Sequence, residues 1–359
     1  MLVASRRKPL GLALLLLLFS DGVPADSAEA LVRVAATEKH MGTQFTILLY
    51  APSESVGKRA IQEAFSRVEQ LDTILSNYGS HTELNRLCRS APQAAPVEVS
   101  ADLWNVLETA DRYAGWSDAA FDVTVGPVTQ LWRRARKRGV LPSAAALEQA
   151  LARVGYRQIE LDRKNRRLRL LQAGVRIDLG GIGKGYAADA ALLEIKRCGI
   201  TRASVDAGGD FALGDPPPEQ VGWKIGIASA DPGGRPDCWL RLSNLAVATS
   251  GDLWQYVEID GTRYSHLVDP RTGLGVTSSA LATVIARDCT SADCLASTIC
   301  ILEPARGLKL VEQLTAGGAR ILTRGGGQVR TFQSPRFSQW LEDPLSGNAA
   351  DGHRRTSAE

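Results

Sequence analysis

Apolar residues recur at helical spacing between Val56 and Tyr78, and polar residues fill the positions between them. Spacings of three and four predict an amphipathic helix that ends near Gly79. Its apolar face is formed by Ala60, Ile61, Ala64, Phe65, Val68, Leu71, Ile74 and Leu75. Between Leu31 and Tyr50 two strand-like runs flank residues 41–45 and precede this helix, and a second helix is predicted over residues 101–114.

After Tyr156 the pattern changes to short β-type runs separated by turn residues. The runs are residues 158–162, 167–171, 175–179, 203–207, 223–228, 239–243, 245–250, 256–260, 262–268 and 281–286. Two helical segments, residues 291–302 and 305–316, and a final strand pair follow. Long helices in the first half and many strands in the second predict an α+β fold with a mainly antiparallel β-rich C-terminal half, instead of alternating β/α units.

Between these halves, residues 126–155 are expected to form a helical excursion, which contains the basic run WRRARKRG, residues 132–139. A run of positive charges favours a solvated helix face, with an anion site as the alternative. The formal net charge of the whole chain is only +3 over 359 residues, so nucleic-acid binding by bulk electrostatics is not expected.

The N-terminus has the pattern of a secretory signal peptide. Arg6, Arg7 and Lys8 precede the apolar run LGLALLLLLF, and small residues follow as far as Ala25. The run is short for a membrane span, and retention as an uncleaved anchor is the alternative. We therefore expect an exported, periplasmic protein. The expected organisation is a signal peptide over residues 1–25, a single domain over 31–340 and a polar, disordered tail over 343–359.

The six cysteines form no C-x-x-C pair and have no histidine at ligand spacing, so a zinc site is not expected. Cys289, Cys294 and Cys300 lie in or near one predicted helix at spacings of five and six, which do not share a face. We interpret them as small buried hydrophobic residues, and the sequence leaves any disulfide pairing open.

The stretch DLGGIGKGYAADA, residues 178–190, places glycines and a lysine between an apolar run and a predicted helix. Chains often approach phosphates in this way because glycines let backbone amides come close and the helix start is positive. The stretch is not a P-loop, since Gly185 follows Lys184 where Ser or Thr is required, and Asp178 occupies the place of the first glycine.

Two other interpretations of this stretch remain. Gly183, Gly185 and Ala188 fit the dinucleotide-binding pattern G-x-G-x-x-A, and Asp206 follows about twenty residues later. Hairpin-like runs on both sides argue against that pattern, because it requires βαβ repetition. A plain glycine turn that caps a helix is the structural alternative.

Six short motifs in order resemble the ApbE family of FAD:protein FMN transferases. They are GWSDAAFDVTVGPVTQLW, DLGGIGKGYAADA, SVDAGGDFALG, VATSGD, YSHLVDPRTG and TSADCLASTICIL, and the resemblance covers residues 39–340. It implies an ApbE-like α+β fold and an exported enzyme that requires Mg²⁺ and uses FAD as substrate. The implied reaction splits the FAD pyrophosphate, joins FMN to a Ser or Thr of an exported or membrane-bound acceptor protein, and releases AMP.

The resemblance implies a metal site formed by Asp293, Ser297 and the backbone carbonyl of Gly181. Asp293 and Ser297 are four apart in a predicted helix, so their side chains share a face. Carboxylate and hydroxyl oxygens suit Mg²⁺. Ser297 replaces the usual Thr, and Ala296 stands where some members carry a further Asp. Taken alone, the spacing is better explained by Asp293 as a helix N-cap.

The resemblance also implies a set of flavin-binding residues. Lys184 would place a positive charge near the pyrophosphate, at a helix start whose amides add to it. A ring such as that of Tyr78 can stack on a planar heterocycle, with core packing as the alternative. The implied set is Met41, Tyr78, Ala120, Phe121, Asp122, Asp178, Lys184 and Val268.

His266, in YSHLVDPRTG, is the candidate general base for the acceptor hydroxyl because an imidazole titrates near neutrality. A histidine that ties down the turn before Asp269 is the alternative. His266 and Asp293 together favour an enzyme over a flavin-binding protein without activity, since a binder needs neither. Hydrolysis of FAD to FMN and AMP would use the same residues, so the sequence does not separate it from transfer.

Overall fold

The computed structural model describes residues 30–342 except 232, 253–255 and 326–327. The predicted signal peptide and the predicted tail lie outside the described residues. Within the described part, no helix is both long and apolar enough to cross a membrane.

An eight-stranded sheet forms the centre of the domain, with the order β1-β2-β6-β7-β10-β13-β14-β15. Every neighbouring pair in it is antiparallel. The strands are β1 (Val32–His40), β2 (Thr43–Ala51), β6 (Ala203–Ala207), β7 (Phe211–Leu213), β10 (Ala246–Gly251), β13 (Ser279–Ala286), β14 (Gly318–Gly325) and β15 (Gln328–Gln333). The dinucleotide-binding interpretation is wrong, because it requires parallel strands joined by the helix.

Side chains alternate between the two faces of this sheet. On β10, Ala246 and Ala248 join the main core beneath the helices, whereas Val247 joins a second cluster on the opposite face. The second face is covered by the hairpin of β8 (Trp223–Ile227) and β9 (Cys238–Leu242) and by a 3₁₀-helix, Pro335–Trp340. All residues of β13 are buried, as expected for a central strand covered on both sides.

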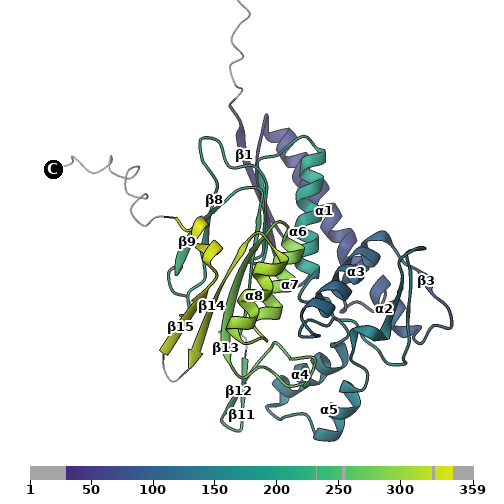
Figure 1. Ribbon diagram of the computed structural model, residues 1–359. Helices are drawn as coiled ribbons and strands as arrows, with labels where there is room; N and C mark the ends of the chain where they lie inside the picture. Colours follow the sequence, from purple (N-terminus) through teal and green to yellow (C-terminus); the bar gives the residue numbers. More distant parts are fainter. Residues whose placement is uncertain (1–29, 232, 253–255, 326–327, 343–359) are drawn as a thin grey trace, which may run out of the picture. The chain divides into compact units, whose positions relative to one another are not determined.

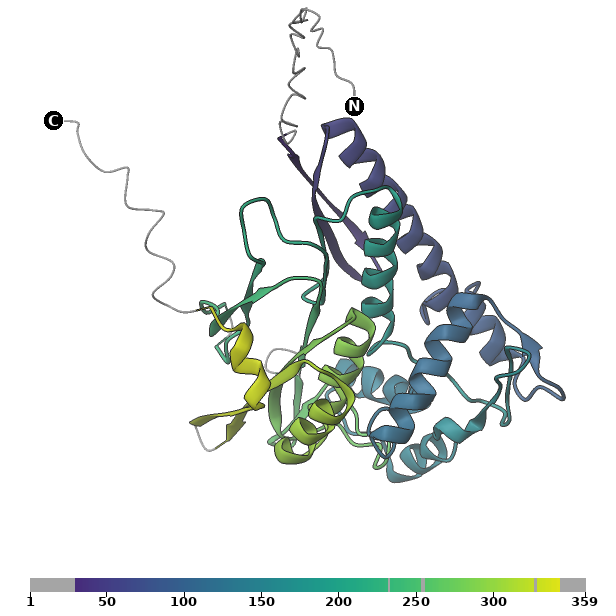
Figure 2. The same ribbon diagram turned by 45° about the horizontal axis from the view of Figure 1, so that its top comes forward.

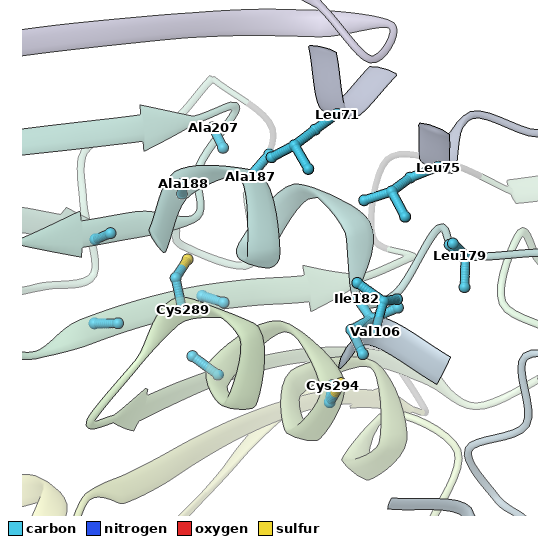
Figure 3. Packing of buried hydrophobic residues seen from close by; sticks show 14 of the residues in the cluster. Leu71, Leu75, Val106, Leu179, Ile182, Ala187, Ala188, Ala207, Cys289 and Cys294 are labelled. Carbon is cyan, nitrogen blue, oxygen red and sulfur yellow. The ribbon is translucent and has the colours of Figure 1, made fainter. Parts of the chain in front are cut away.

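Three helices carry the main core: α1 (Glu54–Leu75), α6 (Gly183–Arg197) and α7 (Cys289–Ile299). Figures 1 and 2 both show α1 alongside α6. In Figure 3, Leu71 of α1 points toward Ala187 of α6, while Cys289 of α7 lies on the other side of α6. The small alanines of α6 allow this close approach, so α6 and α7 are held tightly beside each other.

The remaining elements include α8 (Pro304–Leu314), which packs beside α7 and against β14 and β15, and the helical excursion. The predicted excursion consists of two helices, α4 and α5, which pack with the β11–β12 hairpin in a separate apolar cluster. These elements are α2 (Glu83–Arg89), α3 (Ala101–Trp116), α4 (Gly126–Arg138), α5 (Ala144–Leu151), α8 (Pro304–Leu314), β11 (Tyr256–Ile259), β12 (Thr262–Ser265), and the small sheet of β3 (Val97–Glu98), β5 (Arg167–Leu170) and β4 (Ile159–Asp162).

The α+β prediction is confirmed, and so are the helices predicted over residues 56–78 and 101–114. α1 ends at Leu75, before Gly79, because Ser76 adopts an extended conformation as its C-cap. The strand predicted over residues 175–179 is wrong. Only a single bridge between Val125 and Arg176 forms there, because the chain immediately enters the glycine loop. All six cysteines are free, and Cys289, Cys294 and Cys300 are buried in the core as expected.

Candidate active site

A cavity of about 640 Å³ lies between α4, the glycine loop, α7 and the segment after β12. A volume of this size is typical of small-molecule and cofactor sites. The predicted site residues that line it are Tyr78, Ala120, Phe121, Asp122, Asp178, Gly181, Lys184, His266, Val268, Asp293 and Ser297. Met41 lines an adjoining cavity of about 440 Å³, which shares Tyr78, Asp178 and Lys184 with the first.

Gly185 fixes the distance between α6 and α7. A Cβ at this position would lie 2.7 Å from the carbonyl carbon of Cys289 and 2.9 Å from Cβ of Asp293, so only glycine fits. Its amide N–H donates a hydrogen bond to Oδ2 of Asp293 at 3.2 Å. Asp293 lies inside α7, whose N-cap is Asp288, so the N-cap interpretation of Asp293 is wrong.

Asp293 belongs to a buried group of charges. Lys184, in the first turn of α6, forms an ion pair with Asp210, whose side chain is 3% exposed. Oδ1 of Asp210 accepts a hydrogen bond from the amide of Thr249 at 3.3 Å. Burial, reinforced by the negative charge of Asp210, raises the pKa of Asp293 to about 7, while Lys184 acts in the opposite direction. The group therefore has more carboxylates than cations, which favours an added cation.

Asp210 was not among the predicted site residues. It stands in SVDAGGDFALG, directly after Gly208 and Gly209, which both have positive φ. An acidic residue beside a glycine pair was the only sequence signal for it. Its partner Lys184 was predicted to act on phosphate as an isolated charge, and the structure gives that lysine a buried carboxylate instead.

The implied metal ligands come together on one side of the cavity. Ser297 lies one turn beyond Asp293 on α7, with its hydroxyl 3.4 Å from that of Ser250. Gly181 approaches so closely that a Cβ would lie 3.0 Å from Oγ of Ser297. Among the residues that the structure describes, no group of three or more His, Cys, Asp or Glu could hold a metal. A carboxylate, a hydroxyl and a backbone segment still fit Mg²⁺, which accepts few protein oxygens and keeps its waters.

Asp178, at the start of the glycine loop, lines the cavity within a set of polar contacts. Its Oδ2 accepts hydrogen bonds from Oγ1 of Thr129 at 2.8 Å and from Arg133 at 3.1 Å, and its Oδ1 accepts one from the amide of Gly180 at 3.1 Å. The Arg133 guanidinium lies over the ring of Tyr78, 5.1 Å from its centroid. Tyr78 is 78% exposed, so core packing is not its role.

Asp122 lines the cavity, but its carboxylate is occupied by the protein. Oδ1 accepts hydrogen bonds from the amide and the hydroxyl of Thr124, at 2.8 and 2.6 Å, and Oδ2 accepts one from the amide of Tyr156 at 2.7 Å. Burial raises the pKa of Asp122, and these bonds partly oppose that effect. The carboxylate therefore fixes the loop before α4, and Ala120 and Phe121 beside it supply apolar lining.

His266 and Val268 enter the cavity from a loop that is tied to α4. The indole N–H of Trp132 donates a hydrogen bond to the carbonyl of Gly273 at 2.8 Å, and Val268 forms a bridge with Gly275. Asp269 accepts hydrogen bonds from the amide and Nε of Arg271, both at 2.9 Å, which shapes the turn. The loop that carries His266 into the cavity lining is therefore anchored to α4.

The basic run is split by the helical geometry of α4. Arg133 and Arg136 line the cavity, whereas Arg134, Lys137 and Arg138 are exposed. The predicted solvated face is therefore correct for the second group and wrong for the first, because residues three apart on a helix share a face.

The sequence and the structure of the chain are similar to those of proteins from one family. The ApbE family model matches residues 41–322. The FAD:protein FMN transferase of Treponema pallidum is 31% identical over 312 residues, which covers 81% of this chain and 85% of that protein. The enzyme of the same name from Haemophilus influenzae is 28% identical, with 86% of this chain and 92% of that protein covered. The solved structure of the flavin transferase ApbE from Vibrio cholerae is similar with a TM-score of 0.78 at 26% identity, over 87% of this chain and 100% of that one.

Proposed function

The chain belongs to the ApbE family and is a flavin transferase, and we propose that it joins FMN from FAD to a Ser or Thr hydroxyl of an acceptor protein, with Mg²⁺ bound at the site. The observation that carries this proposal is one cavity with separate groups for each part of the reaction. Asp293 and Ser297 lie on α7, Lys184 lies at the start of α6, and His266 lies on the loop tied to α4.

The proposed reaction is a single displacement at phosphorus. The acceptor hydroxyl oxygen attacks the phosphorus of the FMN half, a new P–O bond forms, and the anhydride P–O bond to AMP breaks with its electrons. His266 accepts the proton that the hydroxyl loses, and AMP leaves as a phosphate monoester. The product is FMN joined to the protein by a phosphoester.

Asp293, Ser297 and the carbonyl of Gly181 would hold the Mg²⁺, and their oxygen chemistry fits this ion. When bound, Mg²⁺ supplies positive charge that stabilises the charge developing on the pyrophosphate. Asp210 keeps Lys184 fixed at the start of α6. Tyr78 and the Asp178–Arg133 pair form the flat, polar frame proposed for the flavin.

Hydrolysis of FAD to FMN and AMP is the second candidate, since water could replace the acceptor hydroxyl in the same cavity. A flavin-binding protein without activity is less well supported, because binding alone would require neither the buried carboxylate of Asp293 nor the imidazole of His266 in the cavity.

The test is to incubate the protein with FAD, Mg²⁺ and an acceptor domain that a related transferase modifies, and to follow flavin fluorescence on the denatured acceptor. We expect fluorescence with the parent protein and none with Asp293→Asn, whereas Glu312→Gln, an exposed change on α8, should behave like the parent. Equal labelling with Asp293→Asn or in excess EDTA would remove the metal from the proposal.

We also propose that the protein is exported to the periplasm, on the basis of the charged start and the run LGLALLLLLF. N-terminal sequencing of protein from the periplasmic fraction should find a start close to Asp26. A start at Met1 in the membrane fraction would instead support the uncleaved anchor.

A further inference from the structure

Two arginines on one face of α4, Arg133 and Arg136, line the cavity. Thr129, Trp132, Arg133 and Arg136 of α4 all line it, and their spacings of three, one and three define a single helical face. The helix is held in this orientation at its first residue and at its middle. A Cβ on Gly126 would lie 2.8 Å from the carbonyl carbon of Arg176, and the buried Trp132 is bonded to Gly273.

The two arginines differ in their partners. Arg133 is ion-paired with Asp178 at 3.1 Å and covers Tyr78. Arg136 lies one turn further along, half-buried, and among the described residues no carboxylate lies within ion-pair distance of it. The charge of Arg133 is therefore neutralised by Asp178, whereas Arg136 adds an unpaired positive charge to the same side of the cavity.

Other charged groups that line the cavity already have partners within the protein, so Arg136 is available to bind an anion. Lys184 is already compensated by Asp210, and Asp122 is satisfied by Thr124 and Tyr156. A pyrophosphate brings two negative charges into the cavity, more than a compensated lysine can offset. A guanidinium can bind phosphate oxygens through two parallel N–H donors, which an ammonium cannot do.

Given the proposed function, we propose that Arg136 binds the pyrophosphate of FAD from the α4 side of the cavity and so distinguishes FAD from flavins without a pyrophosphate. Arg133 serves as a positioning residue for Tyr78 and Asp178. Arg136 belongs neither to the glycine loop nor to the implied metal ligands.

The test compares Arg136→Ala with Arg134→Ala, which removes the same charge from an exposed position on the same helix. Dissociation constants for FAD, ADP and riboflavin are measured by calorimetry without Mg²⁺. We expect Arg136→Ala to weaken FAD and ADP about 10- to 100-fold and riboflavin less than about twofold, as for the loss of a charge-assisted hydrogen bond. Arg134→Ala should match the parent, and Arg136→Lys should recover part of the loss.

Three results would overturn the inference. Equal FAD affinity for Arg136→Ala and Arg134→Ala would remove Arg136 from the FAD site. Equal losses of affinity for FAD and riboflavin would indicate that the substitution disturbs Tyr78, Arg133 and Asp178 instead of removing a contact to the pyrophosphate. Unchanged FAD affinity with a higher KM for the acceptor domain would place Arg136 on the acceptor surface. If the parent binds FAD but transfers nothing, the proposed function fails, and the binding comparison still decides the role of Arg136.

Discussion

Replacing Gly185 by alanine should destabilise the protein and disturb the metal side of the cavity together. The new methyl group would lie 2.7 Å from the carbonyl carbon of Cys289 and even closer to its oxygen, and 2.9 Å from Cβ of Asp293. Two of these atoms belong to the backbone of α7, so no side-chain rotation relieves the overlap. The two helices must separate, and the bond from the Gly185 amide to Asp293 is lost with them.

The neighbouring glycine of α6 provides a matched control. A Cβ on Gly183 would meet only Cβ of Leu179, at 3.7 Å, which is ordinary van der Waals contact. Replacing glycine by alanine within a helix raises the free energy of unfolding by about 0.5–1 kcal/mol, and this gain applies at either position. Overpacking costs about 1–3 kcal/mol. We therefore expect the free energy of unfolding of Gly185→Ala to be lower than that of Gly183→Ala by about 1–3 kcal/mol.

The assay is urea unfolding of both variants without Mg²⁺, followed by circular dichroism, with the slope of the transition checked for equality. Transfer of FMN at saturating FAD is measured on the same samples at a temperature where both variants remain folded. Gly185→Ala should lose activity even when folded. Equal stabilities for the two variants would show that α6 and α7 are not packed as tightly as described, and the structural basis for the placement of Asp293 would fail.

Four further predictions concern the buried charges and the proposed base. Lys184→Ala should lower the free energy of unfolding by about 3–5 kcal/mol, because it leaves the buried Asp210 unpaired, and Lys184→Met with Asp210→Asn should recover most of that loss in a double-mutant cycle. Burial raises the pKa of Asp293 to about 7, so protons compete with Mg²⁺ for this carboxylate below that pH. The Mg²⁺ affinity measured by calorimetry should therefore rise about tenfold per pH unit up to about pH 7 and then level off. Without metal the same raised pKa makes stability fall as the pH rises from about 4 to 7, whereas Asp293→Asn should lack this slope. His266→Asn should bind FAD nearly as well as the parent but transfer FMN about 10²–10⁴-fold more slowly, and a parallel loss of FAD affinity would assign His266 to binding.

Local patterns account for the parts of the fold and site that the sequence predicts. The apolar face of α1 and the four-residue spacing of Asp293 and Ser297 follow from helix periodicity, and both are found where expected. The Asp210 partner of Lys184 depends on tertiary packing, because β7 brings it beside α6 from 26 residues away in the chain. No local pattern encodes that pairing.

The basic run shows the same limit. Its composition is that of a solvated helix face, and three of its cations are exposed. Whether Arg136 faces a cavity depends on where α4 is anchored, which is set by Gly126 against Arg176 and by Trp132 against Gly273. These contacts join segments that are distant in sequence. The periodicity of α4 therefore predicts that Arg133 and Arg136 share a face, but it does not predict that this face is turned toward the cavity.

The central claim is transfer of FMN to a protein hydroxyl, and the mass of the acceptor tests it most directly. After incubation with FAD and Mg²⁺, the intact acceptor domain should gain the mass of FMN less one water, fragmentation should place it on a Ser or Thr, and AMP should form in equal amount. AMP and free FMN without a mass change on the acceptor would contradict transfer and establish hydrolysis. Unchanged FAD would contradict both and leave a flavin-binding protein.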